Sequence, residues 1–543
     1  RQHEQNIENM EGRLFSLIST YIEDKTWEDV STWPNRLDKI TKEDVVRVAN
    51  KYFGDDYFVF NSKMGFPKKN KLEKPPFKPV IPKNSEKQSD YAASVRAIPA
   101  KQLDLKFIEF DSDVTYKEIS DNIHLYKSEN PINSIFNLTL QYSMGTLEDS
   151  KLEQAAELLN LLGTSNYSFN EFKSELQKIG TTISFSSDKN YFIIKVQGFD
   201  KYFDESIQYV NEFISNVKGD DKKIKILADN AKSSRKMEAE DTPKIGRALR
   251  DYVNFGDKSY YLRRLTLDEI KKTKSADYIT SFKNALNYEL SILYSGRLNM
   301  EAIESSIKEN LTLSEKPINS DSPASANLVV NKRDKNTIFL VDDKEAVQSQ
   351  IYFLSSGSII NEENRAASAA YNKYFSGGMS SIVFQEIREF RSLAYSSWAS
   401  YNTPWHNDKE GNFMGYVGCQ ADKTLEAISV FKDIALNMPL KPERLEQTKS
   451  SLIKGINSKR PNFRRFPSMV SGWMMKGYTE DPRKAQVNYF NTMSFDDILD
   501  FQKEHVSSQP MTITILTDKE RIDMEELKKF GEIIILDKDD ILN

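Results

Sequence analysis

The sequence has little of what several large protein classes require. Its 543 residues include one cysteine, Cys419, so the chain can hold no internal disulfide and no cysteine-based zinc cage. We interpret Cys419 as a small buried residue. The longest apolar runs, such as residues 533–536, are far shorter than the ~20 residues that a membrane-spanning helix needs. A disulfide scaffold and a transmembrane segment are therefore excluded.

An excess of charge of one sign is also lacking. The 75 basic and 80 acidic residues give a net charge of -5 and are spread along the sequence. A protein that follows a phosphate backbone needs a basic stripe, so we do not expect nucleic acid as a partner. A hydrophobic fraction of 39% suffices for folded cores, and this length predicts more than one domain.

No secretion signal can be found at the start of the sequence. Residue 1 is Arg1, and no apolar signal segment follows it, so we expect this sequence to be an internal piece of a longer chain. We expect a soluble protein whose location is unknown from these residues. A signal peptide upstream would make it periplasmic or exported.

Familiar catalytic motifs are missing too. The four histidines, His3, His124, His406 and His505, include no pair spaced to share one helical face, so no local histidine motif for zinc exists. There is no glycine-serine-glycine elbow of the hydrolase kind. The segment 376–381 contains a glycine pair but lacks the spaced glycines and lysine of a phosphate-binding loop.

What the sequence does contain is an internal repeat. A capping Thr or Ser with acids in the first helical turn recurs three times, and each predicted helix is followed by a predicted strand. The copies are separated by 225 and 228 residues, which is a normal length for one domain. The three helix starts are Thr41 to Val45, Thr266 to Ile270 and Ser494 to Ile498, and the strands are Tyr57 to Asn61, Glu289 to Tyr294 and Met511 to Leu516.

The beginnings of the two complete copies also correspond. Phe136 to Tyr142, ending at Gly145, and Gln350 to Leu354, ending at Gly357, each predict a strand, a glycine turn and a helix. The first copy lacks such a beginning. The domain plan is therefore residues 1–65 as the tail of a preceding domain, 66–105 as an extended hinge linker rich in Pro and Lys, 106–325 as a third domain and 326–543 as a fourth.

Each complete repeat mixes short strands with long amphipathic helices. The helices predicted at Tyr202 to Val217 and Lys423 to Met438 have apolar residues at helical spacing. The fold class is therefore α+β, most simply a sheet with helices on one face.

One segment of the fourth domain stands out as a candidate binding site. We expect a helix over Ile382 to Phe390 and a strand from about Ala394, so that Arg388 and Tyr395 both approach the start of that strand. A guanidinium fork and a phenol there could hold a peptide carbonyl or carboxylate. The alternative interpretation is a packing contact between domains.

The same segment resembles a known family. Ser376-Gly377-Gly378-Met379-Ser380-Ser381, Phe384-Gln385-Glu386-Ile387-Arg388-Glu389 and Ser392-Leu393-Ala394-Tyr395 are similar to a block of the pitrilysin/insulysin-type (inverzincin) zinc metallopeptidases. The resemblance implies repeated two-layer α/β-sandwich domains that form half of a clamshell. It covers the whole chain and makes it the C-terminal, non-catalytic half.

The resemblance also implies where a zinc site would be. The inverted H-x-x-E-H motif of the family precedes a glycine-threonine, here Gly163-Thr164, so its positions fall on 154–158. Gln154 and Leu158 replace the two histidines, and Glu157 remains. A third ligand would fall near Glu238 and Glu240. We therefore expect no catalytic residue and no bound metal in this chain, and zinc in an upstream catalytic half.

In this family an arginine and a tyrosine at the same spacing reach the substrate backbone, so the resemblance implies substrate binding for Arg388 and Tyr395. The expected function is a zinc-less half that closes the chamber of a metalloendopeptidase and orients its substrate. The expected partners are a peptide or unfolded polypeptide and the upstream half, in the same chain or in a partner subunit. By itself this chain should be inactive. The alternative is a non-enzymatic scaffold or peptide-binding subunit of the same family.

Overall fold

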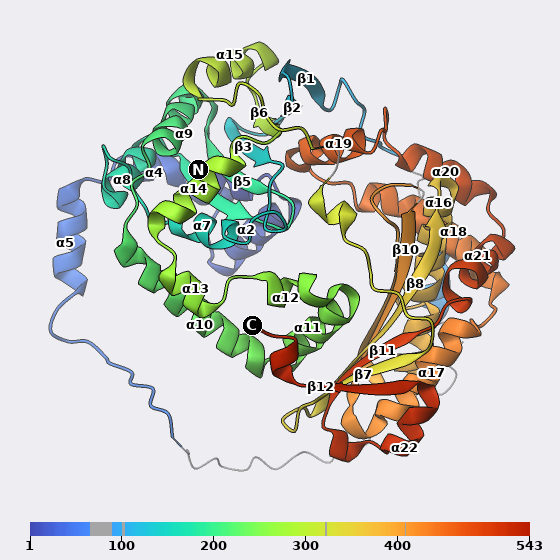
Figure 1. Ribbon diagram of the computed structural model, residues 1–543. Coiled ribbons are helices and arrows are strands. Elements are labelled where there is room, and N and C mark those ends of the chain that lie inside the picture. The colour runs from blue at the N-terminus through green and yellow to red at the C-terminus, as the bar shows by residue number, and fades with distance from the viewer. Residues whose placement is uncertain (66–88, 100–103, 321–322, 408) are drawn as a thin grey trace. The chain divides into compact units, whose positions relative to one another are not determined.

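The computed structural model describes residues 1–65, 89–99, 104–320, 323–407 and 409–543. Residue contacts divide the chain into two units, Gln2–Asp104 and Leu105–Asn543, the latter together with Arg1 (Figure 1). Most of the expected hinge linker, 66–105, lies outside the described residues. Within the described ranges, no helix has the length and apolar character needed to cross a membrane.

In the unit Gln2–Asp104, the regular structure of residues 2–65, 89–99 and 104 is helical. Thr41 and Asp44 form the predicted capping box at the start of α5. The strand predicted at Tyr57 to Asn61 is wrong: these residues have no regular structure, because the described part of the unit offers no second strand to pair with. Part of the expected extended linker is also helical. The helices are α1 Gln2–Asn6, α2 Met10–Ile22, α3 Trp27–Ser31, α4 Trp33–Leu37, α5 Lys42–Tyr52 and α6 Asp90–Ala97.

The second unit contains two mixed six-stranded sheets, which confirms the α+β class. The first has the strand order β1-β2-β6-β3-β5-β4 and the second β12-β7-β11-β8-β10-β9. In each sheet the other pairings are antiparallel, and the parallel ones are β2 with β6, and β7 with both β11 and β12. The strands are β1 Thr115–Ser120, β2 Ile123–Glu129, β3 Ile135–Tyr142, β4 Thr182–Ser187, β5 Phe192–Phe199, β6 Leu290–Gly296, β7 Thr337–Asp342, β8 Gln348–Ile360, β9 Ala394–Asn402, β10 Lys409–Gln420, β11 Thr512–Thr517 and β12 Glu532–Leu536.

The repeat found in the sequence is visible in these sheets. Capping boxes join Thr266 to Glu269 and Ser494 to Asp497, and each helix is followed by its predicted strand, β6 or β11. One expectation fails. β8 does not end at a turn at Gly357 but continues to Ile360. The glycine is there because a Cβ at this position would lie 2.0 Å from the Tyr401 hydroxyl.

Helices cover one face of each sheet and enclose a separate core. The core of the first sheet includes Leu140, Leu158 and Phe282, and that of the second includes Phe353, Tyr371 and Ile515. The helices of the third domain are α7 Leu152–Leu159, α8 Phe169–Lys178, α9 Phe203–Asn216, α10 Ile224–Glu240, α11 Thr242–Phe255, α12 Tyr260–Arg263, α13 Leu267–Lys272, α14 Ser275–Ala285 and α15 Met300–Asn310. Those of the fourth domain are α16 Glu362–Ser376, α17 Thr424–Leu436, α18 Leu445–Ser458, α19 Phe466–Met475, α20 Arg483–Thr492, α21 Phe495–Gln502 and α22 Met524–Leu527.

Each domain also lends one helix to the other face of its neighbour's sheet (Figure 1). In α11, Ile245 and Leu249 pack against Phe339, Val341 and Leu354 of the second sheet. In return, α19 packs Phe466 and Val470 against Tyr126 and Leu293 of the first sheet. Both helices have a proline in their first turn and occupy equivalent places in the repeat. The exchange joins the two domains through buried apolar surface, which favours their unfolding together.

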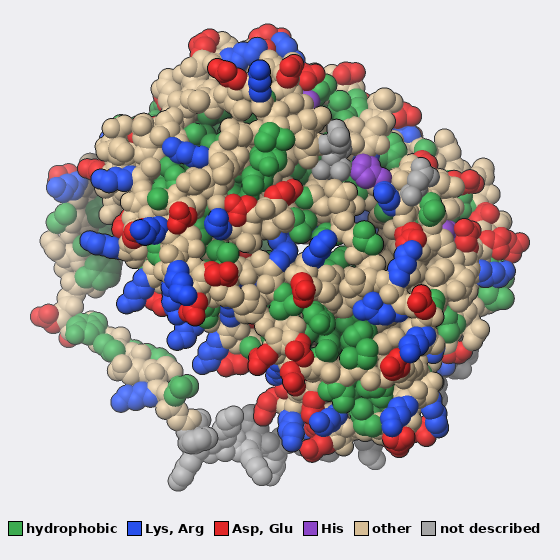
Figure 2. All heavy atoms as spheres, viewed as in Figure 1, with side chains coloured by type: hydrophobic (Ala, Val, Ile, Leu, Met, Phe, Trp, Pro, Cys, Tyr) green, Lys and Arg blue, Asp and Glu red, His purple; other side chains and the backbone are tan. Residues whose placement is uncertain are grey.

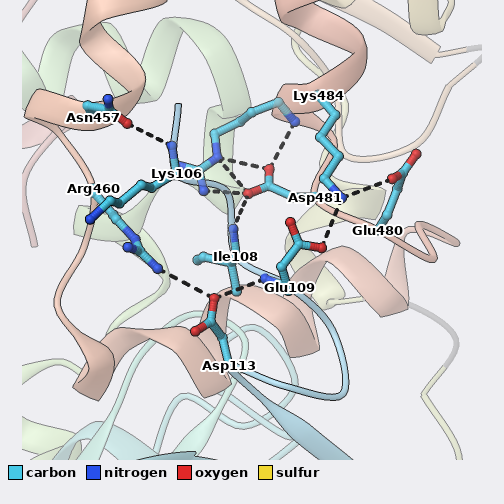
Figure 3. A network of polar contacts seen from close by, with 10 residues as sticks. Lys106, Ile108, Glu109, Asp113, Asn457, Arg460, Glu480, Asp481 and Lys484 are labelled. Carbon is cyan, nitrogen blue, oxygen red and sulfur yellow. Dashed lines mark hydrogen bonds and ion pairs between the residues drawn. The ribbon is translucent and has the colours of Figure 1, made fainter. Parts of the chain in front are cut away.

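A polar strap adds to this interface. Residues 105–113, which precede the first sheet, bind along α18 and α20 of the fourth domain (Figure 3). The carboxylate of Asp481 is fully buried, accepts a hydrogen bond from the Ile108 N–H at 2.9 Å and is held by the guanidinium of Arg483. The start of the third domain is therefore fixed to the fourth.

Opposite charges are mixed on the surface. On the face in Figure 2, Lys and Arg side chains are interspersed with Asp and Glu side chains. Many are close pairs one turn apart, such as Lys178 with Glu175 at 2.6 Å and Lys528 with Glu525 at 2.6 Å. Such exposed pairs contribute only ~0–1 kcal/mol each, so they favour solubility more than stability.

Candidate functional site

The candidate site lies where a short helix meets the edge strand β9. The helix predicted at Ile382 to Phe390 is present, but Phe384–Glu389 forms a π-helix, a form that is frequent at functional sites. Ser392, between the helix and the strand, has a φ of 50°, which is rare for a residue other than glycine. β9 then begins at Ala394, as expected. The connection is therefore short and sharply bent.

A β-bulge turns Tyr395 out of the sheet. In the pairing of β9 with β10, Ala394 lies opposite Cys419 and Ser396 opposite Gly418, so Tyr395 is the extra residue between them. Bulges re-aim side chains and are frequent next to active sites. The Tyr395 side chain is 82% exposed.

The structure brings the two predicted residues together. The guanidinium carbon of Arg388 lies 4.4 Å from the centroid of the Tyr395 ring and 4.9 Å from that of Phe384. A cation over an aromatic face is attracted by the ring, which holds the arginine in one orientation. Arg388, which is partly exposed, and Tyr395, which is exposed, therefore form one solvent-accessible pair.

The neighbours of Arg388 are engaged elsewhere, whereas its own donors are available. Gln385 accepts from Arg444, and Glu386 pairs with Arg391. Apart from the Glu389 carboxylate at 3.5 Å, no polar partner of the Arg388 guanidinium is found among the described residues. A guanidinium with free N–H groups beside a phenol suits a carbonyl or carboxylate acceptor.

The aromatic residues that follow Tyr395 divide between the two faces of the sheet. Tyr401 is 2% exposed and belongs to the helix-covered core. Trp398 points to the other face, where its ring stacks on that of Tyr416 with 5.9 Å between centroids. Trp398, which is 36% exposed, adds to the accessible surface near Tyr395.

The positions that resemble a zinc motif lie on α7 and do not fit zinc. Leu158 is fully buried in the core, and Gln154 is 5% exposed with its Oε1 atom lacking a hydrogen-bond partner in the part of the chain that the structure describes. Glu157 is exposed. Leucine is no zinc ligand and glutamine a poor one, so this helix face cannot bind the metal as the motif would.

The expected third ligand is engaged with a cation of the protein itself. Glu238 accepts a hydrogen bond from Arg264 at 2.7 Å, and both side chains are nearly buried. The Tyr260 hydroxyl donates to Glu153 of α7 at 2.8 Å, and desolvation together with that carboxylate raises the pKa of Tyr260. Glu240 faces Lys236 at 3.9 Å. A guanidinium thus neutralises the carboxylate that zinc would otherwise need.

The histidines do not form a metal centre in the described ranges either. His124 lies between the Tyr116 hydroxyl and Glu289, and His505 is fully buried beside Phe501. Across the described residues, no group of three or more His, Cys, Asp or Glu side chains could hold a metal ion. Cys419 is buried, as expected.

Sequence reasoning missed the residues that close the edge of β9. Asn372 and Ser376 of α16 hydrogen-bond to the outer side of this strand. An available signal was a second asparagine, Asn160, at the matching place of the preceding repeat, near the end of α7. Its significance depends on which strand lies at the sheet edge, which the sequence does not specify.

Parts of the chain are similar in sequence to known proteins. Residues 270–452 match the family model of the peptidase M16 inactive domain. An uncharacterized zinc protease from Streptomyces coelicolor is 32% identical over 90 residues, which is 17% of this chain. The match spans only 19% of that relative's length.

Solved structures show the same fold. The peptidase M16 inactive domain from Pseudomonas fluorescens superposes with a TM-score of 0.59 at 14% identity, covering 74% of this chain and 97% of that one. The periplasmic protease PqqL from Escherichia coli gives a TM-score of 0.61 at 14% identity, with 88% of this chain and 51% of that one covered. Residues 270–452 therefore match the inactive domain of the peptidase M16 family, and the fold of the chain is that of solved M16 inactive domains.

Proposed function

We propose that this chain is the zinc-less C-terminal half of a zinc metalloendopeptidase, which closes the reaction chamber and orients the substrate. Its single strongest support is the pair Arg388 and Tyr395. The two side chains are stacked and accessible at the start of an edge strand, and apart from the Glu389 carboxylate near Arg388 no described residue engages their donors. The substrate would be a peptide or an unfolded polypeptide.

The pair would act by orientation. The N–H groups of Arg388 and the hydroxyl of Tyr395 would donate to carbonyl oxygens of an extended peptide and fix its position. Holding a scissile bond in a reactive geometry is worth several orders of magnitude in rate. Because the motif positions Gln154 and Leu158 do not fit zinc, the proposal places the metal in the upstream half.

The helices at the beginning of the chain support a partner surface. Of the side chains described in Gln2–Asp104, only Thr20 is buried. Large apolar side chains are exposed there, such as Phe15 at 64% and Tyr21 at 87% on α2. Exposed apolar faces of this kind mark sites of association. The proposal assigns them to the contact with the upstream half, in the same chain or in a partner subunit.

The location of the protein remains part of the proposal. The structural neighbour PqqL is described as periplasmic. A signal peptide in the upstream sequence would place this protein in the periplasm or outside the cell as well.

Substitutions in the full-length protein test the substrate-binding role. We expect Arg388→Ala and Tyr395→Phe each to lower the turnover of an internally quenched peptide by roughly 10- to 1,000-fold, since orienting contacts are lost. Arg521→Ala, at an exposed arginine paired with Asp518, serves as the matched control and should leave turnover unchanged. Unchanged kinetics in both site variants would remove the proposed role.

A second measurement concerns the metal. The 543-residue chain by itself should bind less than one equivalent of zinc and should not cleave the peptide, because Gln154 and Leu158 are not ligands. Elemental analysis after dialysis against zinc gives the stoichiometry. One tightly bound zinc per chain would contradict the assignment of the metal to the upstream half.

A further inference from the structure

The outer edge of β9 is closed along part of its length. Asn372 of α16 accepts a hydrogen bond from the Tyr401 N–H at 2.6 Å and donates to the Tyr401 carbonyl at 2.9 Å. Ser376 of the same helix accepts from the Ala399 N–H at 2.8 Å. An exposed sheet edge invites pairing with another chain, and these side chains block it at two successive outward-facing residues.

The other repeat has the same device. Asn160 of α7 accepts from the Phe185 N–H at 3.1 Å and donates to the Phe185 carbonyl at 2.8 Å, on the edge strand β4. In both domains, therefore, an asparagine from the helix beside the sheet replaces a missing neighbouring strand at one residue. Its recurrence indicates that closing these edges matters in both domains.

The closure of β9 stops before its start. In an antiparallel pair, the N–H and C=O groups of alternate residues point away from the partner strand. The register with β10 is regular from Ser396 to Asn402. The backbone N–H and C=O of Ser397 therefore point away from β10, like those of Ala399 and Tyr401. Among the described residues, no hydrogen-bond partner is found for the backbone N–H and C=O of Ser397. Ser397 lies two residues from Tyr395, so its unpaired backbone groups are close to the pair formed by Arg388 and Tyr395.

We propose that the backbone of Ser397 is a binding site for one residue of an extended substrate peptide, next to Arg388 and Tyr395. The inference rests on the proposed function and deepens it. The Ser397 N–H donates to a peptide carbonyl and its C=O accepts from the N–H of the same peptide residue. The two side chains then donate to carbonyls further along the peptide.

The occupant is a short extended segment rather than a second copy of this chain. Asn372 and Ser376 prevent pairing beyond Ser397 towards Asn402, so a long added strand does not fit. A single residue pair contributes little alone and needs the neighbouring Arg388 contacts to be effective. Backbone pairing reads no side chain, so the site accepts many sequences, as β-strand addition does.

Ser397→Pro in the full-length protein tests the backbone donor. Proline removes the N–H, and at an edge it leaves the ladder with β10 intact because that group points outward. One lost hydrogen bond of ~0.5–1.5 kcal/mol corresponds to a roughly 2- to 13-fold weaker affinity. The probe is a fluorescein-labelled substrate peptide, measured by anisotropy on metal-stripped protein so that it is not cleaved. Ser397→Ala, which keeps the N–H, should bind like the unmodified protein.

The outcomes separate this inference from the proposed function. If Arg388→Ala weakens binding while Ser397→Pro equals Ser397→Ala, the backbone site is wrong and the substrate-binding role stands. If Arg388→Ala, Ser397→Pro and Ser397→Ala all bind the peptide like the unmodified protein, both the backbone site and the substrate-binding role are wrong.

A second measurement does not depend on the folding of the proline variant. In the unmodified full-length protein, hydrogen exchange of the Ser397 amide should slow when the peptide is saturating. The backbone amide of the neighbouring Trp398 points to β10, so its hydrogen exchange should not change and serves as an internal reference. Exchange of Ser397 that is unaffected by the peptide would overturn the proposal.

Discussion

Replacement of Asp481 by alanine tests the strap that joins the two domains of the second unit (Figure 3). The Asp481 carboxylate is fully buried and accepts from the Ile108 N–H at 2.9 Å and from the Arg483 Nε at 2.9 Å. Alanine would leave the Ile108 N–H without an acceptor and Arg483 without its counter-charge. Both consequences destabilise the folded state.

The size of the effect follows from burial. A buried donor left without a partner costs about 1–3 kcal/mol. Breaking a buried ion pair from one side costs about 3–5 kcal/mol, and here the lower end applies, because the Arg483 side chain is 17% exposed and can be partly hydrated. The two penalties overlap, so we expect a loss of about 3 kcal/mol in the free energy of unfolding.

Urea unfolding of the chain, followed by far-UV circular dichroism, measures this loss. Because α11 and α19 are exchanged between the domains, Leu105–Asn543 should unfold in one transition, and the free energies of the variants can then be compared. Glu109→Ala is the control, since Glu109 forms an exposed pair with Lys484 at 3.0 Å and should cost less than about 1 kcal/mol. If Asp481→Ala destabilises no more than Glu109→Ala, the argument for the strap is refuted.

Two further predictions concern buried groups. Desolvation lowers the pKa of His505 below its usual value, so the unfolded chain binds a proton at higher pH than the folded one. Stability should therefore fall as the pH drops below about 6.5, and His505→Phe should flatten this dependence of the urea midpoint; an equal slope in both proteins would contradict it. Burial raises the pKa of Cys419 to about 12, so it should react with a disulfide reagent at pH 8 only on unfolding. Rapid reaction of the folded chain would show that this thiol is accessible.

Local signals in the sequence predicted much of the fold. The capping residues Thr41, Thr266 and Ser494 act through atoms three residues away, so their pattern is visible without tertiary information. The alternating run at Phe136 became β3 for the same reason, since the side chains of a strand alternate between core and surface. The proximity of Arg388 and Tyr395 followed from the prediction of a helix that ends just before a strand begins.

Features that depend on distant contacts could not be predicted. Gly357 was interpreted as a turn, although it lies inside β8 and makes room for Tyr401, which is 44 positions later. The exchange of α11 and α19 involves helices whose apolar faces suit any sheet, so their sequence does not say which sheet they cover. The bulge at Tyr395 depends on the pairing of its neighbours, Ala394 with Cys419 and Ser396 with Gly418, on the distant strand β10.

The positions that resemble the zinc motif are filled by buried residues in both repeats. Six and two residues before Asn160 these are Gln154 and Leu158, and six and two residues before Asn372 they are Ala366 and Ala370. In both repeats this helix face packs as core, and an asparagine on the same helix reaches the edge strand. The closure by Asn372 and Ser376 ends before Ser397, which is why the proposed peptide site lies there, beside Arg388.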